Sequence, residues 1–155
     1  MIDTREVANG ENRVTIEFTA NDQSLNRRDE FLYTLLVPDR ARTLFPCFDQ
    51  PDMKSLFTLS LEVPSSWQAV TNGAVEQVDS TSVARRKRIS FRETEPLSTY
   101  LFSFVAGKLT RETYSRDGRN ISIYHRETDP KKVAQCSDIA SVSYTHLTLP
   151  TTPYV

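Results

Sequence analysis

The sequence predicts an all-β domain, an antiparallel sandwich or curved sheet, with the start of one helix near the C-terminus. The first observation is a period of two in the apolar residues, which is typical of strands with one face on a core. The second is the turn chemistry between these runs, with Asn72-Gly73 and Asp117-Gly118 as hairpin signals. Short strands separated by turns favour an antiparallel arrangement.

Strand signals recur along most of the chain. Val14, Ile16 and Phe18 alternate with polar residues, so the first predicted strand covers residues 14–18. Further strands are expected at residues 31–37, 57–63, 88–92, 100–105 and 121–123. The run at 100–105 is apolar on both faces, which predicts a central strand.

A helix start is visible at Thr128-Asp129-Pro130, where a capping residue precedes proline at the first helical position. The composition changes near residue 142, because residues 142–155 contain no Asp, Glu, Lys or Arg and are rich in Thr and Pro. We expect the helix to stop before this point. The last fourteen residues are interpreted as a non-native tail similar to translated adaptor sequence. A natural flexible tail is the alternative.

These signals divide the chain into three parts. Residues 1–127 are the predicted β domain, 128–141 are a linker with a truncated first helix, and 142–155 are interpreted as the non-native tail. The truncated helix is expected to lead out of this domain.

Length and charge exclude several classes of protein. The chain has 155 residues, the size of one ordinary domain, and 19 Lys+Arg against 20 Asp+Glu give a net charge of -1. This balance argues against a chain that coats nucleic acid or an anionic membrane. There is no long apolar run, so neither a membrane span nor a signal peptide is predicted. The compartment stays open between bacterial cytoplasm and periplasm.

Residues 34–54 are unsuited to both strand and helix, because three prolines interrupt them. Asp49 follows a compact aromatic turn, and a buried carboxylate there would need a partner. Arg42 is the nearest basic candidate, so we predict an ion pair or a shared hydrogen-bond network between Arg42 and Asp49. The alternative is that both are solvated turn residues.

The same segment carries a resemblance to a known family. Residues 41–51 read ARTLFPCFDQP, which resembles the Ala-Arg-x-x-Phe-Pro-Cys-Phe-Asp-Glu/Gln-Pro signature of the aminopeptidase N family of zinc metallopeptidases (gluzincins). Two further segments, 51–73 with Trp67 and 95–107, resemble strands of that family in the right order. The resemblance covers about residues 10–140. It implies a saddle-like, all-β N-terminal domain, normally followed by a thermolysin-like catalytic domain.

The resemblance does not extend to catalytic residues. The family holds zinc with two histidines of an HExxH helix and a later glutamate, and no HExxH occurs in this sequence. His125 is interpreted as an ordinary histidine on a strand face. We therefore expect no catalytic residues, no zinc and no peptidase activity in this chain alone. The intact protein is expected to bind zinc, to act on peptides and to need the catalytic domain of the same chain as partner.

Substrate-binding positions are also implied by the resemblance. Family members commonly carry Gln-x-Glu just before the proline that opens the signature segment, and those side chains approach the substrate's first residue. The matching positions here are Leu35 and Val37, which cannot bind an ammonium group. Either they form an apolar pocket wall while another domain holds the amine, or the intact protein has altered specificity or no activity.

Other candidates are interpreted as structural. The basic run 85–88 is interpreted as a solvated strand edge; the alternative is a patch that binds nucleic acid or an anionic surface. Cys47 and Cys136 are expected to stay unpaired. Five aromatic residues are assigned to the core rather than to a binding site: Phe45, Phe48, Tyr100, Phe102 and Phe104. An exposed apolar patch is expected where the catalytic domain docks, and with it limited solubility or self-association.

The sequence thus predicts the N-terminal, non-catalytic domain of a zinc-dependent aminopeptidase that hydrolyses N-terminal peptide bonds. The alternative is a non-enzymatic β-sandwich module that binds peptides or a protein partner. An HExxH motif and a matching glutamate encoded downstream of residue 141 would favour the enzyme.

Overall fold

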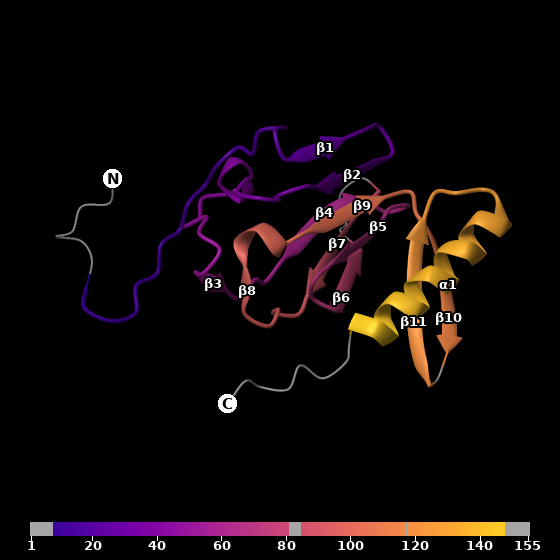
Figure 1. Cartoon of the computed structure of the whole chain (residues 1–155). Coiled ribbons are helices and arrows are strands. Elements are labelled where there is room, and N and C mark those ends of the chain that lie inside the picture. The colour runs from indigo at the N-terminus through magenta and orange to yellow at the C-terminus, as the bar shows by residue number, and fades with distance from the viewer. Residues whose placement is uncertain (1–7, 81–84, 117, 148–155) are drawn as a thin grey trace, which may run out of the picture.

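The computed structural model describes residues 8–80, 85–116 and 118–147 (Figure 1). It consists mainly of antiparallel strands, with one α-helix among the described residues, so the predicted all-β class is confirmed. The strands are β1 Leu25–Arg27, β2 Phe31–Thr34, β3 Lys54–Ser55, β4 Ser60–Pro64, β5 Gln68–Thr71, β6 Val75–Ser80, β7 Arg86–Phe91, β8 Leu97–Ser98, β9 Phe104–Gly107, β10 Thr110–Arg116 and β11 Arg119–His125. The helix is α1 Pro130–Leu147. The finer prediction of a saddle-like sandwich stays a prediction.

Two larger sheets have the orders β1-β2-β9-β5 and β4-β7-β6, and two pairs, β3-β8 and β10-β11, complete the described strands. β9 lies between β2 and β5, with Ala106 opposite both Leu32 and Ala69. The predicted central strand is therefore present, but it begins at Phe104. Residues Thr99–Leu101, which the prediction placed partly in that strand, form a 3₁₀ turn instead.

The hydrophobic core has two neighbouring clusters of buried side chains. One contains Leu25, Leu36, Ala41, Leu44 and Phe102, and the other contains Val63, Ala69, Ile89, Phe91 and Ala106. The second cluster combines residues of both larger sheets, so these sheets share a buried interface. Leu32 and Leu59 pack against both clusters and join them.

The two predicted hairpin turns have different outcomes. β10 and β11 pair in register through the turn that contains Gly118, as predicted, although Asp117 lies outside the described residues. The hairpin prediction at Asn72-Gly73 is wrong, because β5 and β6 belong to different sheets.

The turn at Asn72-Gly73 instead anchors a distant segment. The Asn72 side chain donates to the Leu101 carbonyl at 3.2 Å and accepts from the Ser103 amide at 2.8 Å. A Cβ added at Gly73 would overlap the Arg92 carbonyl, so only glycine allows this close approach of two backbones.

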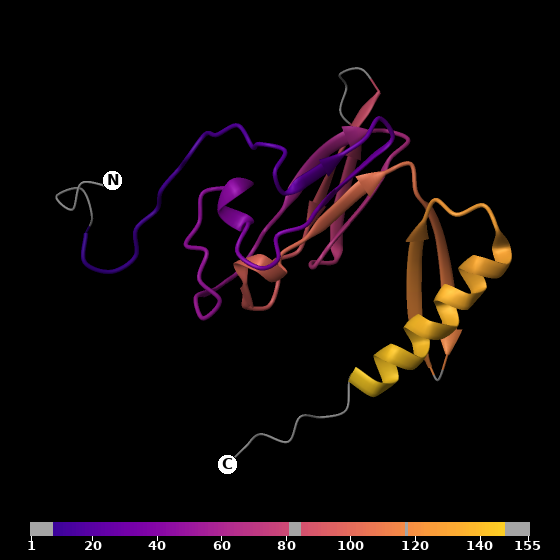
Figure 2. The ribbon, with the colours of Figure 1, turned by 45° about the horizontal axis from the view of Figure 1, so that its top comes forward.

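The predicted first strand is also wrong. Residues 13–19 are in an extended segment outside any sheet, and Val14, Ile16 and Phe18 are 60%, 52% and 53% exposed. Figure 2 shows this segment running away from the sheets toward the N-terminus. The alternation satisfies the side-chain requirement of a strand, but a strand also needs a neighbour for its backbone groups. Within the described chain, residues 13–19 have no such neighbour.

Helix α1 begins at Pro130, as predicted, with Asp129 accepting a hydrogen bond from the Lys131 amide at 2.9 Å. The expected end near residue 141 is wrong, because the helix continues to Leu147. Residues 142–147 contain neither Gly nor Pro, so nothing in them breaks the helix before the segment that precedes Pro150. The origin of residues 142–155 stays a prediction, and 148–155 lie outside the described residues.

Val133 and Ser137 are the buried residues of α1 among its described side chains. Figure 1 shows the helix lying along the β10-β11 hairpin, at one end of the molecule. Over the described ranges, no helix is long and apolar enough to span a bilayer.

A group of charges joins this hairpin to the larger sheet. Glu30 binds the Lys108 ammonium through one carboxylate oxygen and the Arg126 guanidinium through the other, each at 2.8 Å. The Arg126 guanidinium also lies 4.6 Å from the centre of the Phe31 ring. These groups hold the start of β2, the end of β9 and the end of β11 together.

Candidate functional site

The signature loop, residues 41–51, is built around the side chain of Asp49, which is only 4% exposed. Its Oδ2 accepts a hydrogen bond from the Arg42 backbone amide at 3.1 Å, and its Oδ1 accepts one from the Thr99 hydroxyl at 2.8 Å. The Arg42 guanidinium lies 3.9 Å from Oδ2. The predicted network between Arg42 and Asp49 is therefore confirmed.

Thr99 is the member of this network that the sequence reasoning missed. It lies in the 3₁₀ turn before β9, fifty residues after Asp49, and is 2% exposed. The Arg42 guanidinium binds Asp39 at 3.1 Å and is itself more than half exposed. The buried carboxylate thus depends mainly on one amide and one hydroxyl. Because both of its oxygens are occupied, Asp49 is fitted to hold the loop rather than to act on a substrate.

The aromatic residues meet next to this loop. The Phe57 and Phe102 rings stack with centroids 4.3 Å apart, and Phe45 meets both rings edge-on. Core packing is confirmed for Phe102, which is 5% exposed, while Phe45 and Phe104 are partly buried against it. The predicted assignment to the core is wrong for Phe48, which is 75% exposed. Asp49 turns inward to its two donors, and the neighbouring Phe48 ring is left outside.

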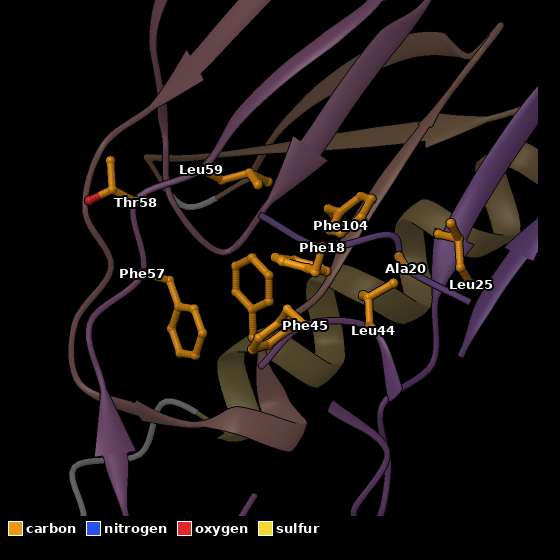
Figure 3. A pocket seen from close by; sticks show the side chains of 10 residues that line it. Phe18, Ala20, Leu25, Leu44, Phe45, Phe57, Thr58, Leu59 and Phe104 are labelled. Atoms are coloured by element: carbon orange, nitrogen blue, oxygen red, sulfur yellow. The ribbon is translucent and has the colours of Figure 1, made fainter. Parts of the chain in front are cut away.

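An apolar cavity of ≈ 330 Å³ opens beside these rings (Figure 3). Its lining comes from the extended N-terminal segment, from β1 and from the signature loop and the strands near it: Phe18, Ala20, Leu25, Leu44, Phe45, Phe57, Thr58, Leu59, Phe102 and Phe104. Thr58 supplies the one hydroxyl of this lining, and no lining side chain is charged. The cavity can accept apolar groups but offers no acid, base or nucleophile for bond cleavage.

Leu35 and Val37, the two predicted substrate positions, lie after β2 and before the signature loop. Both are about half exposed, at 51% and 52%, and neither lines the cavity around Phe102. The Leu35 amide donates to the Ser24 carbonyl at 2.9 Å, which fixes the backbone here. Their side chains face solvent and are available to a partner surface. Their role in a substrate pocket stays a prediction.

His125 lies on β11, where its side chain is 14% exposed. Its Nε2 lies 3.3 Å from a Glu112 carboxylate oxygen without making a hydrogen bond, and its Nδ1 lies 3.1 Å from the Glu127 carbonyl oxygen. The Tyr114 hydroxyl donates to the other Glu112 oxygen, and this bond raises the pKa of Tyr114. The group ties the strands of the hairpin together, in keeping with a strand-face histidine.

The described parts of the chain contain no group of side chains arranged to bind a metal ion. No cluster of three or more His, Cys, Asp or Glu side chains that could hold a metal ion occurs among them. The residues described here therefore do not fit a catalytic zinc site, which needs three protein ligands.

The basic run lies in the middle of a sheet rather than at an edge, since β7 has β4 and β6 as neighbours. The predicted position at a sheet edge is therefore wrong. Its solvated character is confirmed, because Arg86 and Arg88 are about half exposed. Both approach Glu62 on β4, with nitrogen–oxygen distances of 2.9 and 4.0 Å. The basic side chains of β7 therefore pair with an acidic side chain of the neighbouring strand β4.

Cys47 and Cys136 are both unpaired. Burial, together with the nearby Asp49 charge, raises the pKa of the Cys47 thiol. A raised pKa keeps this thiol protonated and weakly reactive, so Cys47 is suited to packing rather than to chemistry.

Comparison of the sequence with models of known protein families identifies the family of this chain. The sequence model of the Peptidase M1 N-terminal domain matches residues 4–101, more than half of the chain. This chain belongs to the peptidase M1 N-terminal domain family. The match includes the signature loop, the Asn72-Gly73 turn and the Thr99 turn, so the three segments that carried the resemblance lie in the family region or extend from it. Strands β10 and β11 and helix α1 lie after the matched residues.

Individual relatives agree with the family. The chain is 38% identical over 96 residues to a protein named "Probable M1 family aminopeptidase 2" from Encephalitozoon cuniculi, covering 61% of this chain and 11% of the relative. It is 30% identical over 108 residues to a glutamyl aminopeptidase from Rattus norvegicus, covering 69% and 11%. It is 36% identical over 84 residues to an aminopeptidase N from Acetobacter pasteurianus, covering 54% and 23%. The chain thus spans a small part of the length of these relatives.

Proposed function

We propose that this chain acts as the N-terminal, non-catalytic domain of a zinc-dependent aminopeptidase that hydrolyses the first peptide bond of its substrates. The observation that carries the proposal is the signature loop, which lies in the region matched by the family. Its buried carboxylate, Asp49, is fully engaged by Arg42 and Thr99. A loop fixed in this way is suited to a scaffold that presents surfaces to another domain.

In the intact protein, the zinc would be held by residues outside those described here. It would polarise the substrate carbonyl and activate a water molecule. This chain would contribute the surface before the signature loop, where Leu35 and Val37 are half exposed. In this proposal they line an apolar wall of the substrate pocket, and the substrate's amino group is held by another domain. Neither side chain has an acceptor for an ammonium group.

The test begins with the gene. Recovering the uninterrupted gene downstream of the codon for residue 141 and expressing the encoded protein should reveal HExxH with a later glutamate and about one zinc per chain, the content of a mononuclear site. The intact protein should hydrolyse aminoacyl-anilides, and the purified 155-residue chain should not. Hydrolysis by the purified chain itself would overturn the assignment of a non-catalytic role.

The pocket-wall role has its own test in the intact protein. Val37→Glu adds a carboxylate to the proposed pocket wall, within reach of the substrate's first residue, so KM for substrates with a free amino terminus should fall while KM for amine-blocked analogues stays constant. Glu93→Gln, an exposed change elsewhere on the surface, is the control. An unchanged KM for both substrates would place Val37 outside the pocket.

A second candidate function is a module that binds peptides or a protein partner without cleaving them. The observation that favours it is the apolar character of Leu35 and Val37 at the positions where the family carries polar residues. A downstream sequence without HExxH, joined with peptide binding by the intact protein, would support this second function over the first.

A further inference from the structure

His125 lies at the end of β11, where the hairpin passes into the loop that leads to α1. Its Nδ1 lies 3.1 Å from the Glu127 carbonyl oxygen. Because a carbonyl oxygen can only accept, Nδ1 must carry a proton for this contact to be a hydrogen bond. A neutral imidazole has a single ring proton, so Nε2 is then without one. The neutral side chain therefore presents a lone pair at Nε2.

This lone pair meets a carboxylate of the neighbouring strand. Nε2 lies 3.3 Å from a Glu112 oxygen on β10, and although Nε2 is buried, it makes no hydrogen bond to any of the described residues. Two acceptors at this distance repel each other, and a buried polar atom without a partner is costly. Nε2 is buried by this chain itself, so its lack of a partner does not reflect an open surface that another part of the intact protein would cover.

A second proton on the imidazole would make this contact favourable. An imidazolium carries N–H groups at both nitrogens, so Nε2 can donate to Glu112 while Nδ1 keeps its bond to Glu127. The Glu112 side chain is 41% exposed and has room to turn its oxygen onto Nε2. Histidine is the side chain that gains this charge as the pH falls from about 8 to about 5.

Acidic residues of two elements lie around this contact. On β10, the Tyr114 hydroxyl donates to the second Glu112 oxygen, which holds the carboxylate beside His125. This hydrogen bond is the main cause of the raised pKa of Tyr114, and the Asp138 charge on α1 adds to it. The Glu112 carboxylate is thus engaged at one oxygen and has the other available for an imidazolium.

Glu127 connects the same contact to the start of the helix. Its carboxylate accepts hydrogen bonds from the amides of Thr128 and Asp129 at 2.9 and 3.0 Å, and it lies 3.6 Å from the Lys132 ammonium. The Asp129 bond, followed by the Thr128 bond, lowers the pKa of Glu127. Glu127 therefore holds His125 through its carbonyl and the first turn of α1 through its carboxylate.

We propose that His125 forms a proton-dependent link, in which Nε2 takes up a proton from solvent, donates a hydrogen bond to Glu112 and so fastens β10 to β11 and to the start of α1. The link forms as the pH falls through the range in which histidine titrates, and it is lost as the pH rises. The proposal is independent of the aminopeptidase function, because the residues that it uses all follow those matched by the family.

Nitrogen NMR of the imidazole tests the link without changing any of its groups. His146, the only other histidine in the sequence, is replaced by glutamine so that one imidazole is observed. The ¹⁵N shifts should show a proton on Nδ1 and none on Nε2 at about pH 8, and protons on both nitrogens at about pH 5. A proton on Nε2 alone at about pH 8 would overturn the proposal, because Nε2 would then donate without taking up a proton. A neutral imidazole at about pH 5 would overturn it as well.

Amide hydrogen exchange of the 155-residue chain measures whether the link fastens the hairpin. After correction for the intrinsic exchange rate, protection of the β10 and β11 amides should be about tenfold higher at about pH 5 than at about pH 8, the effect of one hydrogen bond to a charged group. Glu112→Gln should remove this difference. Its NH₂ group can donate to the neutral Nε2, and its oxygen can still accept from Tyr114.

Two further variants complete the design. His125→Gln removes the titrating group and should also abolish the difference in protection, which provides a second route if Glu112→Gln does not fold. Glu93→Gln, an exposed change outside the hairpin, is the matched control and should retain the full difference. Circular dichroism checks that each variant is folded. Equal protection of the unaltered chain at both pH values, or a difference that persists in His125→Gln or Glu112→Gln, would overturn the proposal.

Discussion

The buried carboxylate of the signature loop gives the most direct test of the structure. Asp49 accepts hydrogen bonds from the Arg42 amide and the Thr99 hydroxyl, and its side chain is 4% exposed. Asp49→Ala removes both acceptors and leaves a buried hydroxyl without a partner. A hydrogen bond to a charged group contributes about 1.5–3 kcal/mol, so the free energy of unfolding should fall by about 3–5 kcal/mol.

Asp49→Asn separates the loss of charge from the loss of hydrogen bonds. Its oxygen can still accept from the Arg42 amide, and its NH₂ group can donate to the Thr99 hydroxyl oxygen. We therefore expect a smaller loss of about 1–2 kcal/mol. Thr99→Val removes one donor, and its effect should be less than additive with Asp49→Ala, because the two residues share one bond.

Urea denaturation followed by fluorescence measures these changes. Trp67 is the only tryptophan in the sequence and packs against the second core cluster, so its emission reports on the fold. Phe48→Ala is the control, because this neighbouring ring is 75% exposed and its loss should cost less than about 0.5 kcal/mol. If Asp49→Ala were no more destabilising than Phe48→Ala, the loop would not depend on this carboxylate.

Three further predictions concern the core, a charge group and a glycine. Phe102→Ala should destabilise the chain by about 3–5 kcal/mol in urea titrations, because it empties the centre of the aromatic cluster. Lys108, the largest influence, and Arg126 lower the pKa of Glu30. The stabilisation from Glu30 should be present above the carboxyl group's ordinary pKa of 4.5 and should be lost as the pH falls through the lowered pKa. Glu30→Gln should therefore make the urea midpoint less dependent on pH in the acid range. Gly73→Ala should lower the thermal midpoint, with a cost of about 1–3 kcal/mol, because the added Cβ overlaps a backbone carbonyl.

Each of these has a matched comparison. Leu101→Ala removes a half-exposed side chain next to Phe102 and should cost far less. Glu93→Gln removes an exposed carboxylate and should leave the pH dependence unchanged. At Gly118, an added Cβ would meet no atom within 4 Å and asparagine tolerates its positive φ, so Gly118→Asn should be nearly neutral. Equal effects within any of these pairs would contradict the corresponding argument.

Features that depend on neighbouring residues were predictable from the sequence. The start of α1 follows from Asp129 and Pro130, which act within one helical turn. The Arg42–Asp49 network follows from a short, proline-limited loop in which a buried acid has few possible partners. These outcomes need little information from the rest of the chain.

Features that depend on distant pairing were not predictable in the same way. The alternation of Val14 to Phe18 describes side chains, whereas a strand also requires a neighbour that the alternation does not name. Asn72-Gly73 has hairpin chemistry, yet its side chain bonds to residues about thirty positions later. Thr99 could have been proposed as a partner for Asp49 only by knowing that the two turns meet.

The link between the hairpin and the larger sheet has a mechanical consequence. The charges around Glu30 are exposed, and exposed ion pairs contribute little to stability. Helix α1 adds few buried side chains of its own. The hairpin and helix should therefore open as a cooperative unit before the central sheet does, and amide exchange should be faster in α1 than in β9. Under mechanical load, this end of the molecule should separate from the central sheet before the signature loop opens.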